Sequence, residues 1–585
     1  MLKALYDYAL QNDLVLPAGF VQKPVKAYIW LSKKGAFVDV TQGETLPCPD
    51  IGSLAKGPDR CNPLAEKRSV VFPETQTPKS GYFRQLLADG GQQEPVLQVC
   101  LAALENPETV QAINAALNRM KVKTSDCISF CVDGEPILNS GAVKSWWAEF
   151  RRKFLPSGLQ SLCLITGQPT VPPATLPPVK GLQAVGGHSS GTPLMCFDKS
   201  AFCSYGLKQG ANAPVSEEAF AGVKAALDDL LRDAPVLAGM KFVHWYDKPI
   251  PREEDDLFAF FGGEPAEEDE ADPNEARALA DALVSSLVSG GRAAALPNEY
   301  FILLLSGAGG RVMLRHYEQG SYQALQAALS AWNEDLELIN AAGTGLIRPA
   351  KFKARLIRLL SRQKNDRKVF QRLDKELSGL TPAVIRAILS GSELPDTVAS
   401  RALAYIRSQM TDTDPDSKIQ SVPDGFACQW LKVWLLRRER KKNQKETISV
   451  GYNAAHPSPA YHCGALVAVY GAIQRAAMPD VNASVIDRYY DAASQTPALT
   501  LGQLQRLSNY HLSKMISFSV RERYETMLNQ ISDSIGDTIP VTLTLEEQAY
   551  FALGYRQTCS QIAQDIAAYK ASRKESSTKK ETGGN

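Results

Sequence analysis

The sequence predicts an α+β protein, in which a mixed α/β N-terminal domain with antiparallel strands and long loops precedes an all-α C-terminal helical bundle. Within the first 320 residues, short strand-like runs and Gly- and Pro-rich turns alternate with a few helical patterns. Helical periodicity with short connections fills the rest, as in a bundle. The 585 residues are 44% hydrophobic and 22% charged, which is typical of a protein of several domains with real cores.

The N-terminal domain, residues 1–250, begins with a predicted helix at 1–10 and a hairpin at 27–40. In that hairpin, alternating apolar residues flank the turn Ser32-Lys33-Lys34-Gly35. Lysines at a hairpin tip are usually only solvated, and contact with a phosphate is the alternative for Lys33 and Lys34. Residues 48–83 predict loops crossing one face, with Lys79 and Arg84 in or beside them.

The remaining elements of this domain follow from periodicity. Helices are predicted at 97–120 and 143–154, and strands at 127–132, 162–166 and 241–246. A further helix is expected at 214–231, with Ser216 as its N-cap.

A charge boundary separates the two parts of the chain. Residues 252–281 hold two Lys/Arg and twelve Asp/Glu, which gives this segment a charge of −10. Because the net charge of the whole chain is +1, the other residues together carry a charge of +11. A basic body with an acidic insert is compatible with a polyanionic partner. We expect an acidic boundary segment at 251–282, docked through its phenylalanines, and a strand hairpin connector at 283–320 with strands at 300–305 and 312–317.

The helical part divides into a domain with basic faces at 321–477, a bundle at 478–571 and a disordered tail at 572–585. Its predicted helices are 321–339, 352–362, 382–389, 398–410, 425–440, 461–477, 483–493, 501–514, 517–535 and 545–570.

One loop has an inventory suited to binding. The stretch CFDKSAFCSYGLKQGANAPVSE, residues 196–217, contains Ser204, Gly206, Lys208, Gln209 and Asn212. Lys, Gln and Asn supply hydrogen-bond donors and no catalytic base, and Gly206 and Gly210 are expected to permit close approach of the backbone to a partner. An ordinary connecting loop is the alternative.

Two basic stretches suggest a groove for a polyanion. Residues 351–375 hold ten Lys/Arg and two Asp, and Arg355, Arg358 and Arg362 fall on one face of a predicted helix. Residues 432–445 hold seven Lys/Arg and one Glu, including Arg437, Arg438 and Arg440. A merely solvated face is the alternative for each stretch.

Chemistry-bearing signatures are not found in the sequence. The six histidines are dispersed, the eleven cysteines lack CxxC spacing, and the glycine-rich residues 186–191 lack the GK[ST] of a phosphate-binding loop. His456 and His462 are expected to be hydrogen-bonded structural residues. We therefore expect no catalytic residues, no metal and no cofactor. With no apolar run near 20 residues and no signal-like N-terminus, a cytoplasmic protein without membrane contact is expected.

Three blocks resemble one protein family. They are CLITGQP at 163–169, which is followed by VKGLQAVGGHSSG and the loop at 196–217, then YFILLLSGAGGRVMLRHY at 300–317, and VIDRYYDAASQTPALTLGQLQRLSNYHLSKM at 485–515, which is followed by LEEQAYFALGYRQ. Together these resemble the large subunit of the type I-C CRISPR Cascade surveillance complex, the Csd-type family. The segment TPKSGYFRQL at 77–86 departs from the family pattern because it lacks the expected Asn and Asp.

The resemblance implies a ribonucleoprotein function in antiviral defence and no enzymatic activity. Such subunits hold the 5′ end of the guide RNA beside the backbone and 5′-handle-binding subunits. They also read a protospacer-adjacent motif (PAM) in double-stranded DNA, open the duplex to form the R-loop, hold the displaced strand and recruit the helicase-nuclease. A small helical subunit is made from an internal start in this family, for which Met478 is the candidate here.

These roles can be distributed over the candidate residues. A minor groove of A·T pairs presents only acceptors, so the donors Lys208, Gln209 and Asn212 are expected to read the motif. The four cations named at 33, 34, 79 and 84 are expected to contact the duplex backbone, and the two arginine groups are expected to line the path of the displaced strand. A protein-only scaffold and a nuclease or nucleotide-dependent DNA-processing factor remain the alternatives.

Overall fold

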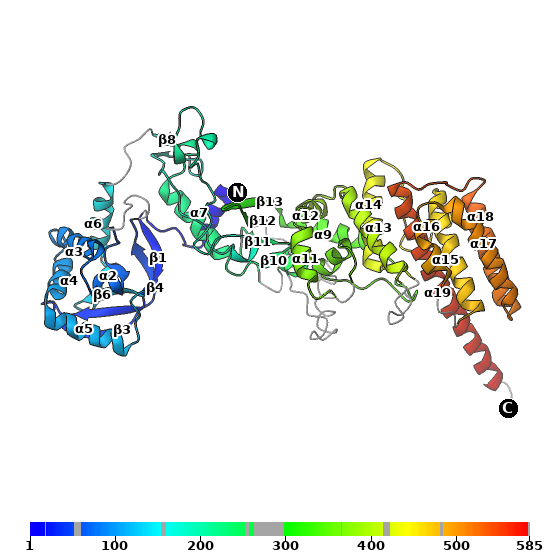
Figure 1. Cartoon of the computed structure of the whole chain (residues 1–585), viewed down its shortest axis with the longest axis horizontal. Helices are drawn as coiled ribbons and strands as arrows, with labels where there is room; N and C mark the ends of the chain where they lie inside the picture. Colours follow the sequence, from blue (N-terminus) through cyan, green and yellow to red (C-terminus); the bar gives the residue numbers. More distant parts are fainter. Residues whose placement is uncertain are drawn as a thin grey trace. The chain divides into compact units, whose positions relative to one another are not determined.

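The computed structural model describes residues 1–17, 19–51, 60–153, 160–251, 255, 257–262, 298–363, 366–412, 422–479 and 484–582, with side chains to residue 571. The chain divides into two compact units. Unit 1 comprises Met1–Asp233 with Gly307–Met313, and unit 2 comprises Ala234–Ser306 with Leu314–Asn585. Strands lie mainly in the N-terminal half and helices fill the C-terminal half, so the α+β class is confirmed (Figure 1).

A mixed sheet forms one core of unit 1. Its strands follow the order β3-β2-β6-β5, and β7 also pairs with β6. The pairing of β2 with β6 is parallel and the other pairings are antiparallel. The strands are β2 (Ala27–Leu31), β3 (Phe37–Gln42), β5 (Ala65–Lys67), β6 (Cys127–Val132) and β7 (Glu135–Pro136), and β1 (Phe20–Pro24) pairs separately with β4 (Thr45–Pro49).

The predicted hairpin is confirmed as β2 and β3. Gly35 donates its N–H to the Ser32 carbonyl at 2.9 Å and has φ +79°, a left-handed conformation that favours glycine. The inward side chains of β2 join those of the flanking helices in a single hydrophobic cluster. These helices are α2 (Arg68–Val71), α3 (Pro78–Gly91), α4 (Pro95–Glu105), α5 (Pro107–Arg119) and α6 (Gly141–Arg152).

Two predictions in this region are wrong. The segment at 77–86 is the start of α3 and not a loop, because Thr77 and Ser80 form a capping box ahead of Pro78. The single helix predicted at 97–120 is two helices, since Asn106 caps α5 and Pro107 occupies its first position. Proline in a helix interior removes a hydrogen bond, which ends α4 there.

The second part of unit 1 is built around α7 (Glu217–Leu230), which packs against α1 (Leu2–Gln11). Ser216 caps α7 as predicted, because its side chain accepts from the Ala219 N–H. The strand predicted at 162–166 is only β8 (Ser161–Leu162), paired with β9 (Pro169–Thr170).

A four-stranded sheet opens unit 2, in the order β10-β11-β12-β13. The strands are β10 (Val236–Leu237), β11 (Met240–Tyr246), β12 (Glu299–Ala308) and β13 (Arg311–Ser321), so the strands predicted at 241–246, 300–305 and 312–317 are confirmed. Residues 257–262 dock on this sheet as expected, since Leu257 and Phe261 are fully buried and Asp255 accepts from the Tyr246 hydroxyl at 2.9 Å. The rest of the acidic segment lies outside the described residues.

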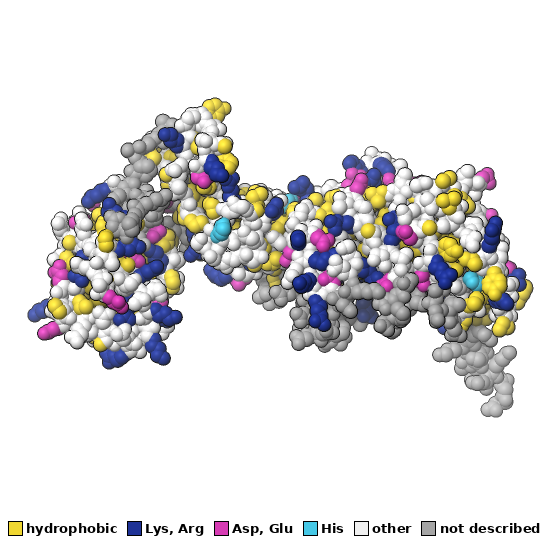
Figure 2. All heavy atoms as spheres, in the orientation of Figure 1, with side chains coloured by type: hydrophobic (Ala, Val, Ile, Leu, Met, Phe, Trp, Pro, Cys, Tyr) yellow, Lys and Arg dark blue, Asp and Glu magenta, His cyan; other side chains and the backbone are white. Residues whose placement is uncertain are grey.

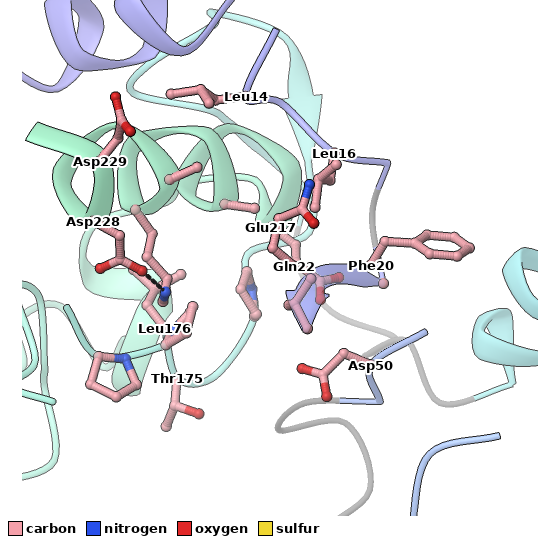
Figure 3. A pocket seen from close by; sticks show the side chains of 18 of the residues that line it. Leu14, Leu16, Phe20, Gln22, Asp50, Thr175, Leu176, Glu217, Asp228 and Asp229 are labelled. Atoms are coloured by element: carbon pink, nitrogen blue, oxygen red, sulfur yellow. Dashed lines mark hydrogen bonds and ion pairs between the residues drawn. The ribbon is translucent and has the colours of Figure 1, made fainter. Parts of the chain in front are cut away.

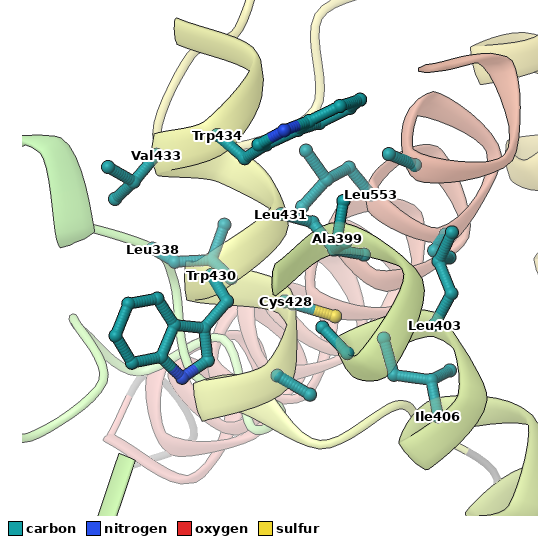
Figure 4. Close-up of a cluster of buried hydrophobic side chains, with 14 of the residues drawn as sticks. Leu338, Ala399, Leu403, Ile406, Cys428, Trp430, Leu431, Val433, Trp434 and Leu553 are labelled. Carbon is teal, nitrogen blue, oxygen red and sulfur yellow. The ribbon is translucent and has the colours of Figure 1, made fainter. Parts of the chain in front are cut away.

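Helices and this sheet share one continuous hydrophobic core in unit 2. Figure 4 shows part of it, where Leu553 of α19 lies near Leu431 of α14. The helices are α9 (Tyr322–Leu336), α10 (Phe352–Leu356), α11 (Val369–Glu376), α12 (Thr381–Ser390), α13 (Asp396–Met410), α14 (Gly425–Lys441), α15 (Pro459–Ala477), α16 (Val485–Ala493), α17 (Pro497–Lys514), α18 (Phe518–Ile535) and α19 (Leu545–Thr582).

Glycines bring α15 and α19 into close contact. A Cβ on Gly464 would lie 2.0 Å from the Phe551 carbonyl oxygen, and a Cβ on Gly554 would lie 2.0 Å from that of Tyr461. Only glycine fits at these two crossing points. The end of α19 continues to Thr582, where the sequence predicts a disordered tail from residue 572, and residues 583–585 lie outside the description.

The helix predicted at 352–362 is wrong in its extent. It ends after five residues, at Leu356, and a single 3-10 turn follows at Ile357–Leu359. Because the chain leaves the α-helical path at that point, Arg358 and Arg362 do not continue a stripe begun by Arg355.

Candidate nucleic-acid interface

The loop at 203–212 presents a tight turn at its tip. The Leu207 N–H donates to the Ser204 carbonyl at 2.9 Å, and both central residues have positive φ, +54° at Tyr205 and +73° at Gly206. Two positive φ values in a four-residue turn are the mark of type I′, which favours Asn or Gly at the position that Tyr205 occupies. The Tyr205 side chain is 100% exposed.

The donors predicted to read the motif have different environments. Lys208 and Gln209 are exposed, and Gln209 also has a positive φ, +46°. Asn212 is half-buried and uses its amide within the loop, where it donates to the Gln209 carbonyl and accepts from the Ser204 N–H, both at 2.9 Å. Asn212 therefore closes the loop, and Lys208 and Gln209 are the side chains left facing solvent.

Gly210 serves the fold and not the approach of a partner. A Cβ there would lie 2.1 Å from the Pro173 carbonyl oxygen, and the Gly210 N–H donates to the Ala174 carbonyl at 3.1 Å. Gly206 differs, because a Cβ there would meet no atom within 4 Å. The loop therefore contacts the connector at 173–174 through Gly210, while its tip at Gly206 faces solvent.

A buried thiol holds the far end of the loop. The Ser216 N–H donates to the Cys163 Sγ at 3.3 Å. Burial alone would raise the pKa of the Cys163 thiol. Hydrogen bonds from the Thr166 side chain and from the N–H groups of Ser216, Thr166 and Ile165 outweigh burial and lower this pKa to about 7.

The tip of the β12–β13 hairpin supports the other side of the loop. The tip meets the glycine-rich segment at Gly186, where a Cβ on Gly307 would lie 2.4 Å from the Gly186 carbonyl carbon. From this tip, Arg311 places its guanidinium 4.2 Å from the ring centroid of Phe202, which is 38% exposed. The sequence did not lead us to select Tyr205, Phe202 or Arg311 as site residues. For Tyr205 a signal was available, because a tyrosine occupies a turn position that favours Asn.

The cations assigned to the duplex backbone do not share one surface element. Lys33 and Lys34 are exposed at the β2–β3 turn, and Lys33 Nζ lies 2.9 Å from an oxygen of Asp133. Lys79 and Arg84 are half-buried on α3, five positions apart, and Arg84 Nε is buried. The contact of these four cations with a duplex stays a prediction, although Lys79 and Arg84 lie on a helix and not in the predicted loops.

The first arginine group is wrong as an outward stripe. Arg355 is 6% exposed, bonds to Gln429, and has its pKa lowered to about 10 by burial. Arg358 Nε lies 3.2 Å from Asp424, and Arg362 Nη1 lies 2.6 Å from Asp412.

In the second group, the structure contradicts an outward position for Arg437, whereas Arg440 is exposed and ion-paired. Arg437 is 3% exposed, with its Nε 3.3 Å from Asp335. Arg440 Nη2 reaches the same carboxylate at 2.8 Å, and Arg438 pairs with Asp396 at 2.9 Å. Local charge counting missed this because the partner carboxylates of Arg437 and Arg438 come from distant segments.

Exposed cations of the basic stretches lie elsewhere. Arg367, Lys368 and Lys375, at and within α11, are exposed and have no carboxylate partner among the described residues, and Phe370 between them is 41% exposed. On the face that Figure 2 shows, Lys and Arg side chains are interspersed with Asp and Glu. Three exposed cations at and within α11 therefore have no ion pair among the described residues.

A cavity of about 540 Å³ lies beside the loop's anchoring connector. Figure 3 shows Glu217, Asp228 and Asp229 of α7 on one side of it, and Phe20 and Asp50 on the other. Several of its acidic side chains are already paired, Glu217 with Arg151 and Asp228 with Lys224. Among the described residues, its lining contains no Ser, Cys or His.

The histidines at 456 and 462 are hydrogen-bonded in the core, as predicted. His456 Nδ1 accepts from the Ser458 N–H at 3.1 Å, and His462 Nε2 lies 2.7 Å from the His456 carbonyl oxygen. Within the described ranges, no group of three or more His, Cys, Asp or Glu could hold a metal ion. None of the described helices is long and apolar enough to cross a bilayer.

Comparison with known protein families gives a match over most of the chain. The sequence model of a family described as CRISPR-associated protein (Cas_Csd1) matches residues 2–562, nearly the whole chain. No curated protein matches the chain.

Proposed function

The chain belongs to the Cas_Csd1 family of CRISPR-associated proteins, and from this premise we propose that it reads the PAM in target DNA as the large subunit of a type I-C Cascade complex. In this proposal the guide RNA reads the target by base pairing, while the protein reads the motif and the DNA backbone. The subunit then helps to open the duplex, holds the displaced strand and recruits the helicase-nuclease. It performs no catalytic step itself.

The observation that carries the proposal is the loop at 203–212. It presents the exposed donors Lys208 and Gln209 on a backbone that is fixed at Ala174, Ser216 and Asn212. Acceptors alone line a minor groove of A·T pairs, so a fixed loop with free donors suits that surface. Asn212 contributes by keeping the loop closed, which presents the two donors together.

The displaced strand is assigned to a revised surface. Arg355 and Arg437 are buried and are not proposed as strand contacts. Arg367, Lys368 and Lys375 are exposed, with Phe370 among them. Positive side chains beside an exposed aromatic ring suit single-stranded DNA, because the cations attract phosphates and the ring stacks on bases. Four further arginines would have to break their ion pairs before they could contact the displaced strand. These are Arg358, Arg362, Arg438 and Arg440.

Protein partners are proposed from the family and from exposed apolar side chains. Ile516 and Phe518, at the turn between α17 and α18, are 103% and 76% exposed. Such side chains suit a contact with another subunit. The proposed partners are the Cascade backbone subunits, the 5′-handle-binding subunit and a small helical subunit, together with the 5′ end of the guide RNA.

The test uses the complex assembled with its guide RNA. Binding is measured against duplexes that carry every variant of the short segment beside the guide-matched sequence. The wild-type complex should prefer a few variants, and Lys208→Ala with Gln209→Ala should flatten that preference by roughly fivefold per lost hydrogen bond while leaving assembly with guide RNA intact.

A matched control is Lys144→Ala, an exposed lysine on α6 whose loss should leave the preference unchanged. A wild-type complex that binds all segment variants equally would overturn the proposal. Unchanged preference in the double variant would overturn the assignment to this loop.

A further inference from the structure

We propose that Tyr205 stacks on an unpaired base of the target DNA, beside the motif that the loop is proposed to read. This inference rests on the proposed function. It adds Tyr205 and a stacking contact to the hydrogen-bond donors Lys208 and Gln209. Its starting point is a conflict between the backbone and the side chain at the loop tip.

The backbone at Tyr205 favours a different residue. Its φ of +54° lies in the left-handed region, where a Cβ crowds the following carbonyl and costs roughly 1–2 kcal/mol. Asn and Gly tolerate this position of a type I′ turn better than a bulky side chain does. A tyrosine there opposes the local preference, and strain of this kind is concentrated at functional sites.

The side chain of Tyr205 buries no surface against the rest of the fold. It is 100% exposed, so it buries no apolar area that could offset the strain. The neighbouring Gly206 is exposed too, and a Cβ there would meet no atom within 4 Å, so the residue after the ring adds no bulk beside it. The tyrosine is thus presented outward on a turn whose position is fixed by Asn212 and Gly210.

The other side chains of the segment at 196–212 indicate the kind of partner. Lys199 and Lys208 are exposed on the same loop, and Arg311 lies over Phe202 at 4.2 Å; Asp198 is the one acidic residue of the segment at 196–212. An exposed aromatic ring on a segment that also carries exposed lysines suits nucleic acid, because the lysines attract phosphates and an unpaired base offers a flat face to the ring. Bases inside a closed duplex are already stacked, so the ring selects a base at an opened end.

The key variant is Tyr205→Asn, which removes the ring and favours the turn. The loop should therefore stay folded, and the melting temperature of the complex should be equal or higher. Tyr205→Phe keeps the ring and should bind as wild type. Stacking on one base is worth roughly 5- to 150-fold in affinity, which is the loss expected for Tyr205→Asn on a target without an abasic site.

A set of targets, each with one abasic site beside the motif, identifies the contact. At one position the abasic target should weaken wild-type binding, and Tyr205→Asn should add no further loss there, because the same contact has already been removed. Tyr510→Ala, which alters another exposed tyrosine, serves as the control and should leave binding unchanged.

The outcomes separate the inference from the proposed function. If the wild-type complex prefers certain motifs but Tyr205→Asn binds like wild type, the stacking inference is overturned alone. It is also overturned if the loss in Tyr205→Asn is the same at every abasic position. If the wild-type complex shows no motif preference, the proposed function fails first.

Discussion

A fragment that begins at Met478 is expected not to fold, because it lacks α15. That start would give the last 108 residues, from α16 onward. In the full chain α15 contacts α16, α17, α18 and α19, and every residue from Ala460 to Gln474 is buried. The fragment would therefore leave the inner faces of four helices in water.

The magnitude follows from four side chains of α15. Leu466, Val467, Val469 and Ile473 are each at most 5% exposed. Burying one such side chain is worth roughly 1.5–3 kcal/mol, so the four together account for about 6–12 kcal/mol. This loss is comparable with the whole stability of a domain, about 5–15 kcal/mol. The contacts of Gly464 and Gly554 with the facing helix would be lost as well.

The assay compares fragments 456–585 and 478–585 by circular dichroism during thermal unfolding. The longer fragment contains α15 and should unfold cooperatively, whereas the shorter one should show no cooperative transition. A cooperative, monomeric fragment 478–585 would refute this reasoning. If a small helical subunit is made from an internal start, the packing favours a start before α15, and blocking initiation at the Met478 codon should then leave the short product in the purified complex.

Two further predictions concern buried groups of unit 2. Burial, followed by the nearby His462, lowers the pKa of His456 to about 4 from 6.5, so the unfolded chain binds a proton more readily between these values. The free energy of unfolding should therefore fall by on the order of 2 kcal/mol as the pH drops from 6.5 to 4, and His456→Asn should flatten that slope in denaturant titrations; an identical slope in the variant would contradict the assignment. Asp335→Ala should lower the free energy of unfolding by about 3–5 kcal/mol, because it leaves Arg437 buried without its carboxylate. Glu446→Gln, which alters an exposed ion pair with Arg440, should lower it by under about 1 kcal/mol. Equal losses of unfolding free energy in the two variants would refute the argument that burial makes the Asp335–Arg437 pair more important for stability.

The sequence by itself determined those features that depend on neighbours along the chain. The β2–β3 hairpin followed from alternation around a turn that ends in Gly35, and the Ser216 cap followed from a hydroxyl ahead of a helical pattern. The family followed from contiguous blocks of sequence. Local misreadings came from chemistry that periodicity does not carry, such as the capping box at Thr77 and the break at Pro107.

Tertiary structure alone decided which charged and aromatic side chains face solvent. The arginines at 355 and 437 are spaced as a solvated face would be, yet Gln429 and Asp335 reach them from other helices. Tyr205 is the opposite case, an apolar ring left fully in water. Ion pairing and burial depend on contacts between residues far apart in the chain, and a count of charges along the sequence contains no information about them.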